Sequence, residues 1–362
     1  MCESFSICIN AVSIPSHLGG IGNYCFHLVK NLAEHYPNLK ITLIINKNLK
    51  QHFSLLPKNI EIKVVYIRNR YLRHLYLNCI FPFSLKKYDL LHSVANIGII
   101  FCPITQLITV CDSYENVSPE RFSFFKRALM RFLVSQSIKS SKYIIAISQN
   151  TKNDVHKYYQ TSQSKIHVVY LGKKFPVSSH SEKNPKNFLF VGTIEPGKNL
   201  ADVLKAFALF RKKYKERLTI VGIKGWKQSH IFKLIKELQI ENDIDFLGGI
   251  SDQELQQCYC NSIALIQASS YEGFGLPVIE AMSCGCPAIV AKNSSLIEAG
   301  GDAAIFFETR NIHDLLEKMT WLYVNKKERK GIIEKGYIHA NKFDWKKTTQ
   351  KTFHIYQQSL KF

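Results

Sequence analysis

The chain has 362 residues and a formal net charge of +20, and it is long enough for two α/β domains with full cores. The charge favours an anionic partner, for which the candidates are nucleic acid, anionic lipid and a phosphorylated small molecule. No zinc-finger, RRM or KH pattern accompanies it, so nucleic acid is not a predicted partner.

The cysteine pattern and the apolar runs bear on the compartment. The ten cysteines lie singly or as C-x-C, not in the C-x2-C spacing of zinc sites, which indicates reduced thiols and a cytoplasmic protein. Residues 1–14 contain Glu3 and no basic residue, so we expect a first strand there and no signal peptide. No run approaches the roughly 18 apolar residues of a membrane span.

The first part of the chain, residues 1–172, is predicted to be an α/β domain. An apolar strand at 6–14 precedes the glycine-rich loop HLGGIGNY at 17–24 and an amphipathic helix at 24–34. Such a loop lets the backbone approach a phosphate, so Gly19 and Gly20 are candidate ligand contacts. Further strands are predicted at residues 40–45, 61–66, 90–92, 107–110 and 143–147.

Two segments of this domain combine basic and aromatic residues. Residues 121–134, RFSFFKRALMRFLV, have the pattern of a basic amphipathic helix, and residues 68–83 carry RNRYLR followed by FPF. Such segments often lie on an anionic membrane surface. A core helix with a solvated basic edge fits the same pattern, and the residues alone leave both interpretations open.

Residues 172–187 are polar and rich in proline and serine, which is typical of a linker. A second α/β domain is predicted after them, at residues 186–344. Its first strand, at 188–191, leads into a glycine-containing loop that presents Lys198 just before the next helix. A lysine there can neutralise a phosphate, although an ordinary surface lysine fits as well. Further strands are predicted at 218–221 and 244–246.

Residues 263–290, IALIQASSYEGFGLPVIEAMSCGCPAIV, form the most informative stretch. An apolar strand at 263–268 precedes a polar loop, a helix whose first turn holds Pro277, and a further strand at 287–290. Gly273 and Gly275 permit close approach of the backbone to a ligand, and the start of the helix favours an anion. Glu272 and Glu280 lie on either side of this helix start and can accept hydrogen bonds from sugar or ribose hydroxyls.

The segment SSYEGFGLPVIEAMSCGCPAIV resembles the Glu-x7-Glu signature of the retaining GT-B glycosyltransferases of family 4. The resemblance implies two Rossmann-like doubly wound domains facing across a cleft, with residues 345–362 crossing back to the first domain. It also implies that Glu272 contacts hydroxyls of the donor sugar and that Glu280 holds the ribose. The backbone between them would meet the sugar and the diphosphate through Gly273, Phe274, Gly275 and Leu276.

The resemblance extends to other positions. Residues 191–199 resemble the family's VGT-x-EP-x-KN loop, in which the lysine, here Lys198, neutralises the diphosphate. Many relatives add an arginine there, whereas this chain has Thr193 and Gly197 at the candidate places. The loop with Gly19 and Gly20 is similar to the one that closes over the diphosphate and the acceptor side. Where many relatives have a His-Asp pair whose histidine contacts the sugar, this chain has Cys111 and Asp112.

The resemblance therefore implies a retaining glycosyltransferase, and we expect it to need no metal ion and no cofactor. The first expectation is transfer of mannose from GDP-mannose to a glycan or lipid-linked acceptor in bacterial surface polysaccharide biosynthesis, with UDP-sugars as alternative donors. The expected location is the inner face of the cell membrane, with peripheral contact through residues 68–83 and 121–134. Two alternatives are a nucleotide-sugar epimerase of the same fold and a non-catalytic binding protein for nucleotide sugars or membrane surfaces.

Overall fold

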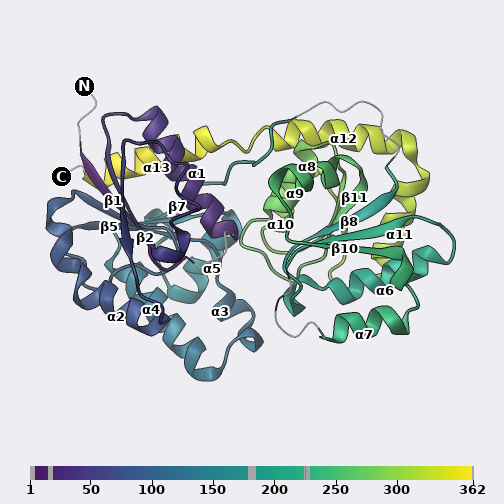
Figure 1. Cartoon of the computed structure of the whole chain (residues 1–362), viewed down its shortest axis with the longest axis horizontal. Helices are drawn as coiled ribbons and strands as arrows, with labels where there is room; N and C mark the ends of the chain where they lie inside the picture. The colour runs from purple at the N-terminus through teal and green to yellow at the C-terminus, as the bar shows by residue number, and fades with distance from the viewer. Residues whose placement is uncertain (1–4, 15–18, 178–184, 224, 226–228, 361–362) are drawn as a thin grey trace. The chain divides into compact units, whose positions relative to one another are not determined.

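The structure, a computed structural model, describes residues 5–14, 19–177, 185–223, 225 and 229–360. The chain divides into two compact units, the first made of Met1–Gly172 with Asp344–Phe362 and the second of Lys173–Phe343 (Figure 1). Residues 17 and 18 of the predicted glycine-rich loop and residues 178–184 of the predicted linker lie outside the described part.

The first unit is built on a seven-stranded parallel sheet in the order β3-β2-β1-β4-β5-β6-β7. Its central strands are apolar along their length because helices cover both faces of the sheet. The strands are β1 (Ser6–Ala11), β2 (Lys40–Asn46), β3 (Ile60–Val65), β4 (Leu90–Ser93), β5 (Thr105–Val110), β6 (Tyr143–Ala146) and β7 (Ile166–Val168).

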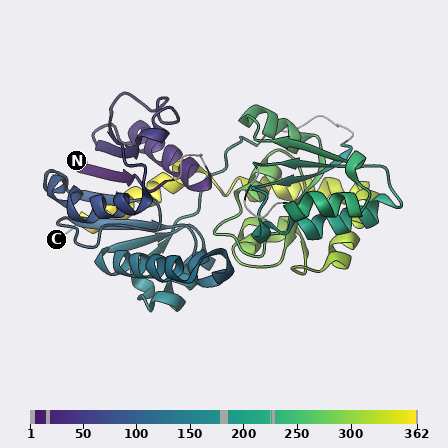
Figure 2. The same cartoon turned by 60° about the horizontal axis from the view of Figure 1, so that its bottom comes forward.

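The helices of this unit lie on two faces of the sheet (Figure 2). One face carries α2 (Arg70–Cys79), α4 (Phe124–Ser140) and α5 (Gln149–Tyr159), whose apolar residues share two clusters with the strands. The other carries α1 (Gly20–His35) and the C-terminal helix α13 (Trp345–Leu360). Tyr356 of α13 lies 2.6 Å, hydroxyl to Nδ1, from His92 of β4. The predicted return of the C-terminal helix to the first domain is therefore correct.

The second unit contains a six-stranded parallel sheet in the order β10-β9-β8-β11-β12-β13. Its strands are β8 (Asn187–Val191), β9 (Arg217–Val221), β10 (Ile244–Gly248), β11 (Ser262–Gln267), β12 (Ala288–Ala291) and β13 (Ile305–Phe307). Its helices are α6 (Leu200–Arg211), α7 (Ser229–Glu237), α8 (Asp252–Cys260), α9 (Leu276–Ser283), α10 (Leu296–Gly300), α11 (Ile312–Val324) and α12 (Lys326–Ala340). Both sheets have the doubly wound order, which confirms the predicted fold class.

Two details differ from the sequence-based expectation. Helix α1 begins at Gly20, four residues before the predicted start, because the first turn of a helix needs no apolar periodicity and tolerates a poor helix former such as glycine. Strand β7 was not predicted. It is an edge strand of three residues, too short to show a hydrophobic pattern.

Candidate active site

The candidate active site lies at the carboxyl ends of β8 and β11 in the second unit. These strands are neighbours, with Leu189 paired to Leu265, although the chain between them builds the other half of the sheet. The strand order reverses at this pair, and such a switch point is where open α/β sheets bind ligands. Lys198 follows β8 and Glu272 follows β11, so the fold brings the two predicted residues to the same place.

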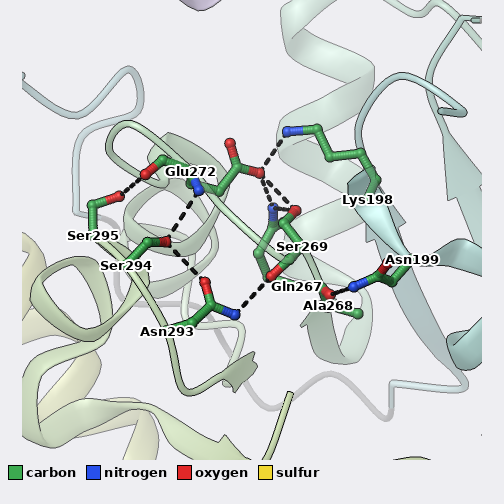
Figure 3. Close-up of polar contacts among 9 residues, drawn as sticks. All are labelled: Lys198, Asn199, Gln267, Ala268, Ser269, Glu272, Asn293, Ser294 and Ser295. Carbon is green, nitrogen blue, oxygen red and sulfur yellow. Dashed lines mark hydrogen bonds and ion pairs between the residues drawn. The ribbon is translucent and has the colours of Figure 1, made fainter. Parts of the chain in front are cut away.

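Glu272 and Lys198 form an ion pair across 74 residues of sequence. Lys198 Nζ lies 2.5 Å from Glu272 Oε1, and both side chains are less than one-fifth exposed. The same carboxylate oxygen accepts hydrogen bonds from Gln267 Nε2 at 2.9 Å and Ser269 Oγ at 2.7 Å (Figure 3). Within the described part of the chain the second oxygen, Oε2, has no hydrogen-bond partner. It is the oxygen left to meet a ligand.

The backbone of Glu272 is held by serines of the loop after β12. Its amide donates to Ser294 Oγ at 3.1 Å, and its carbonyl accepts from Ser295 Oγ at 2.7 Å. Asn293 accepts from Ser294 Oγ and donates to the carbonyl of Ser269, which closes a ring of polar contacts (Figure 3). The backbone and one carboxylate oxygen of Glu272 are therefore both held in place by hydrogen bonds.

The loop that carries Lys198 is docked on the loop after β11 through Asn199. This buried residue adopts a left-handed backbone with φ of 51°. Its side-chain amide donates to the carbonyl of Ala268 at 2.8 Å and to Ser270 Oγ at 2.7 Å. The Ser270 amide also donates to the carbonyl of Gly197 at 3.0 Å. Asn199 therefore holds the loop of Lys198 against the loop after β11.

Sequence reasoning did not single out Asn199, Gln267, Ser269, Ser294 or Ser295 as functional residues. Two features of the sequence could have pointed to Asn199 and Gln267. The family-like loop ends in Lys-Asn, and an apolar strand that ends in a glutamine places a buried polar group at the ligand edge of the sheet. The serines after β12 gave no signal, because only the sheet order places them beside Glu272.

Gly275 is the N-cap residue of α9 and has a conformation that other residues rarely adopt, with φ of 109°. A Cβ atom there would lie 2.9 Å from Ala299 Cβ and 3.1 Å from Leu296 Cδ2. Phe274 is buried with its ring 5.7 Å from that of Phe343. Gly273 is buried as well, and Leu276 is half-buried as the first residue of α9. The backbone of residues 273–276, which is predicted to contact the donor, therefore packs tightly against the rest of the second unit.

We predict that Gly275→Ala destabilises the protein by about 2–4 kcal/mol, because it adds backbone strain to steric overlap. The measurement is a urea unfolding curve. Gly331→Ala is the matched control, since Gly331 lies within α12 with nothing within 4 Å of the added Cβ, and this change should stabilise by about 0.5–1 kcal/mol. Equal unfolding free energies for the two variants would contradict the prediction.

Glu280 lies on the buried side of α9, apart from the Glu272 cluster. Its Oε2 accepts a hydrogen bond from the Tyr259 hydroxyl at 3.1 Å. Burial raises the pKa of this carboxyl, and the nearby Lys174 opposes the rise. Lys174 itself is paired with Asp252 at the start of α8. Glu280 therefore presents a carboxylate held by a tyrosine, which suits hydrogen bonding to a hydroxyl pair.

The remaining predicted residues are not part of these clusters. Thr193, after β8, is half-buried. Gly19 and Gly20 belong to the first unit, where Gly19 caps α1 and Gly20 begins it. A Cβ atom at either position would meet nothing within 4 Å, so packing within the described structure does not require glycine there. Their ligand role stays a prediction.

Cys111 follows β5 directly in the first unit, and its side chain is buried. Its Sγ lies 4.0 Å from the carbonyl of Val94, and its amide donates to Asn96 Oδ1 at 2.7 Å. Burial raises the pKa of the thiol well above its ordinary value, so it remains neutral. A sugar contact through Cys111 is untested and stays a prediction.

Asp112 gives the first unit a pH-dependent stability. Burial, together with the nearby Glu115 carboxylate, raises the pKa of Asp112 to about 6. An aspartate whose pKa is higher in the folded chain than its ordinary value of 3.8 binds its proton more tightly when folded. Its contribution to stability is therefore complete below pH 3.8 and is lost as the pH rises through about 6.

We accordingly predict that Asp112→Asn gains stability relative to the wild type as the pH rises from about 4 to about 7, by up to about 3 kcal/mol. The amide oxygen can still accept from the Tyr114 amide, as Oδ1 does in the wild type. The measurement is the difference in melting temperature between variant and wild type across this range. A difference that is constant with pH would contradict the prediction.

Within the described residues no group of three or more His, Cys, Asp or Glu side chains is arranged to hold a metal ion. A search of the same residues for a helix long and apolar enough to cross a membrane finds none.

Comparison with known proteins gives matches in both units. The family model "Glycosyltransferase Family 4" matches residues 18–172, and "Glycosyl transferases group 1" matches residues 172–339. O-antigen chain mannosyltransferase B of Escherichia coli is 25% identical over 264 residues, which are 69% of this chain and 68% of that protein. O-antigen chain mannosyltransferase RfbU of Salmonella typhimurium is 30% identical over 186 residues, and the match spans about half of each protein, 51% of this chain and 52% of the relative.

Solved structures resemble the whole chain. Anabaena Alr3699/HepE in complex with UDP and glucose superposes with a TM-score of 0.78 at 17% identity, covering 98% of this chain and 100% of that one. WaaG, a glycosyltransferase involved in lipopolysaccharide biosynthesis, gives 0.74 at 16% identity, covering 97% and 98%. These likenesses establish the GT-B fold. Since the two family models together span residues 18–339, this chain belongs to the glycosyltransferases of family 4.

Proposed function

We propose that this glycosyltransferase moves mannose from GDP-mannose to an acceptor hydroxyl on a lipid-linked or lipid-core glycan during assembly of a surface polysaccharide. The proposal on sugar and pathway is supported by relatives from two bacteria that are named O-antigen chain mannosyltransferases. GDP-mannose is the first expectation because the loop after β8 resembles loops of mannosyltransferases, and UDP-sugars are the alternative.

The observation that carries the proposal is the pairing of Lys198 with Glu272 at the switch point of the second sheet. A diphosphate placed there offers Lys198 a stronger anionic partner than a single carboxylate. Glu272 then accepts hydrogen bonds from sugar hydroxyls, while Gln267 and Ser269 keep its orientation. The ion pair thus fixes both side chains before the donor binds. When it binds, Lys198 contacts the diphosphate and Glu272 contacts the sugar.

In the proposed reaction the bond between the anomeric carbon and the phosphate oxygen breaks, and the acceptor oxygen bonds to the same face of that carbon. The acceptor proton passes to the departing phosphate, and the anomeric configuration is retained. Lys198 and the start of α9 stabilise the charge on the leaving diphosphate, and Glu280 anchors the ribose. Catalysis consists of positioning and electrostatics, without a covalent intermediate.

We also propose that no metal ion is required, because Lys198 and the helix start supply the positive charge that a diphosphate needs. The test is a thermal-shift screen against GDP-, UDP-, ADP- and dTDP-sugars with and without EDTA. A shift with GDP-mannose that EDTA leaves unchanged is the expected result. A shift that EDTA abolishes would overturn metal independence, and a shift with another nucleotide alone would overturn the donor.

Turnover distinguishes transfer from the two other functions. A transferase releases GDP only when an acceptor is present, and the product's anomeric coupling in NMR reports retention. An epimerase would convert the nucleotide sugar without an acceptor. A binding protein would show nucleotide binding that survives Glu272→Ala and no turnover in either form.

A further inference from the structure

Three cysteines of the second unit form a cluster where α8 and α9 end. Cys260 is the last residue of α8, Cys284 is the C-cap residue of α9, and Cys286 lies just before β12. The thiols of Cys260 and Cys284 are hydrogen-bonded to each other. Cys286 Sγ lies 3.9 Å from the carbonyl oxygen of Ser262, two residues after Cys260. The cluster therefore consists of two thiols in direct contact and a third beside them.

The three cysteines differ in exposure. Cys284 and Cys286 are 1% and 2% exposed, whereas Cys260 is half-buried. A small reagent from solution therefore reaches Cys260 first, and Cys284 is the thiol in contact with it. The hydrogen bond with Cys260, together with burial, raises the pKa of the Cys284 thiol. Cys284 is therefore protonated at rest, which agrees with the free thiols of the structure.

The tertiary contact selects Cys284 as the partner of Cys260, although Cys258 is closer in sequence. Cys258 and Cys260 both belong to α8, and residues two apart in a helix point to different sides. The thiol of Cys286 is directed to backbone acceptors, with its Sγ 3.5 Å from the carbonyl oxygen of Pro287 and 3.9 Å from that of Ser262. A reaction between neighbouring thiols is favoured by the contact itself, which replaces a bimolecular encounter.

Both helices connect this thiol pair to the contact between Tyr259 and Glu280. Tyr259 is the neighbour of Cys260 in the chain, and its hydroxyl donates to Glu280 Oε2 at 3.1 Å. Glu280 lies one turn before Cys284, whose amide donates to the Glu280 carbonyl oxygen at 3.2 Å. The sulfur atoms of a disulfide are only about 2.05 Å apart. A disulfide between Cys260 and Cys284 would therefore draw the ends of α8 and α9 together beside this hydrogen bond.

We propose that Cys260 and Cys284 are a modification site, a thiol pair that hydrogen peroxide oxidises to a disulfide. The Cys260 sulfur attacks one peroxide oxygen and becomes a sulfenic acid, and the departing hydroxide takes the thiol proton and leaves as water. The Cys284 sulfur then attacks the Cys260 sulfur and loses its own proton to the departing hydroxide, which leaves as a second water. Peroxide is reduced, the two thiols are oxidised, and a dithiol reductant reverses the change.

A disulfide of this kind fits the reducing compartment that the cysteine pattern indicates, because disulfides there are usually transient and redox-sensing. Its effect on the donor rests on the proposed function, in which Glu280 anchors the ribose. We expect the oxidised chain to bind GDP-mannose about tenfold more weakly, the loss expected when a hydrogen bond to a charged group is disturbed. Formation of the disulfide itself does not rest on that function.

The experiment treats the purified full chain with hydrogen peroxide, alkylates the remaining thiols and maps the peptides by mass spectrometry without reduction. We expect a pair of peptides joined through Cys260 and Cys284 that dithiothreitol separates. Cys260→Ser should abolish this pair and is the variant of choice, because the residue is half-buried and serine is similar in size. The matched control is Cys79→Ser, which changes an exposed cysteine of α2 in the first unit and should leave the joined peptides unchanged.

Binding of GDP-mannose is measured on the reduced and the oxidised protein. Peroxide should weaken binding by the wild type and leave binding by Cys260→Ser unchanged. The modification site is overturned if Cys260 and Cys284 are alkylated as free thiols after peroxide, or if Cys260 is joined to any other cysteine. A joined wild type that binds GDP-mannose as the reduced form does would overturn the effect on the donor. Reduced wild type that binds no GDP-mannose would overturn the proposed donor, while the peptide map still tests the thiol pair.

Discussion

Replacing Lys198 by alanine is expected to lower kcat/KM by about 100- to 1,000-fold, the usual loss when a group that stabilises a leaving charge is removed. Lys198 lies at the switch point of the second sheet, beside the predicted donor loop. The polar contacts of Glu272 with Gln267 and Ser269 do not depend on it. We therefore expect the loss in activity with little change in melting temperature.

The measurement is steady-state kinetics with nucleotide sugar and acceptor, together with a melting curve for each variant. Lys205→Ala is the matched control, since Lys205 is an exposed lysine of the following helix α6, and it should retain wild-type activity. Activity of Lys198→Ala within about threefold of wild type would remove Lys198 from the catalytic machinery, since such a loss is below about 1 kcal/mol.

Replacing Glu272 by alanine is expected to lower kcat/KM by more than tenfold, a loss above about 1.4 kcal/mol. The change removes the carboxylate that meets the sugar and also frees Lys198, Gln267 and Ser269 from their shared acceptor. Glu272→Gln keeps an acceptor oxygen for Gln267 and Ser269 but loses the charge. Comparing Glu272→Gln with Glu272→Ala therefore separates the effect of losing the hydrogen bonds to Gln267 and Ser269 from the effect of losing the ion pair with Lys198.

The control for Glu272 is Glu317→Ala, which changes an exposed glutamate on α11. It should leave kcat/KM unchanged. If Glu272→Ala kept more than about a tenth of wild-type kcat/KM, the assignment of Glu272 would be wrong. Because Lys198 and Glu272 are in contact, the double variant should lose less than the product of the two single losses. Losses that multiply would mean that the two side chains act independently.

Much of the fold could be predicted from the sequence, because buried parallel strands appear as continuous apolar runs separated by helices. The unit from β11 to β12 is the clearest case: Pro277 and Gly275 mark the start of a helix through local backbone geometry alone. Short edge strands such as β7 and the first turn of α1 carry no such local signal, and these were missed.

The sequence by itself determined the residue types of the site, namely two carboxylates, a lysine and a glycine-rich helix start, since their chemistry and spacing are local properties. Only the tertiary structure decided that Lys198 pairs with Glu272 and that Asn199 docks one loop on the other, because neighbouring strands β8 and β11 are separated by two intervening strands in the chain. The structure also decided which half of α4 is buried. Apolar periodicity is the same for a helix that packs on a core and for one that faces a membrane, and only the position of the sheet distinguishes the two.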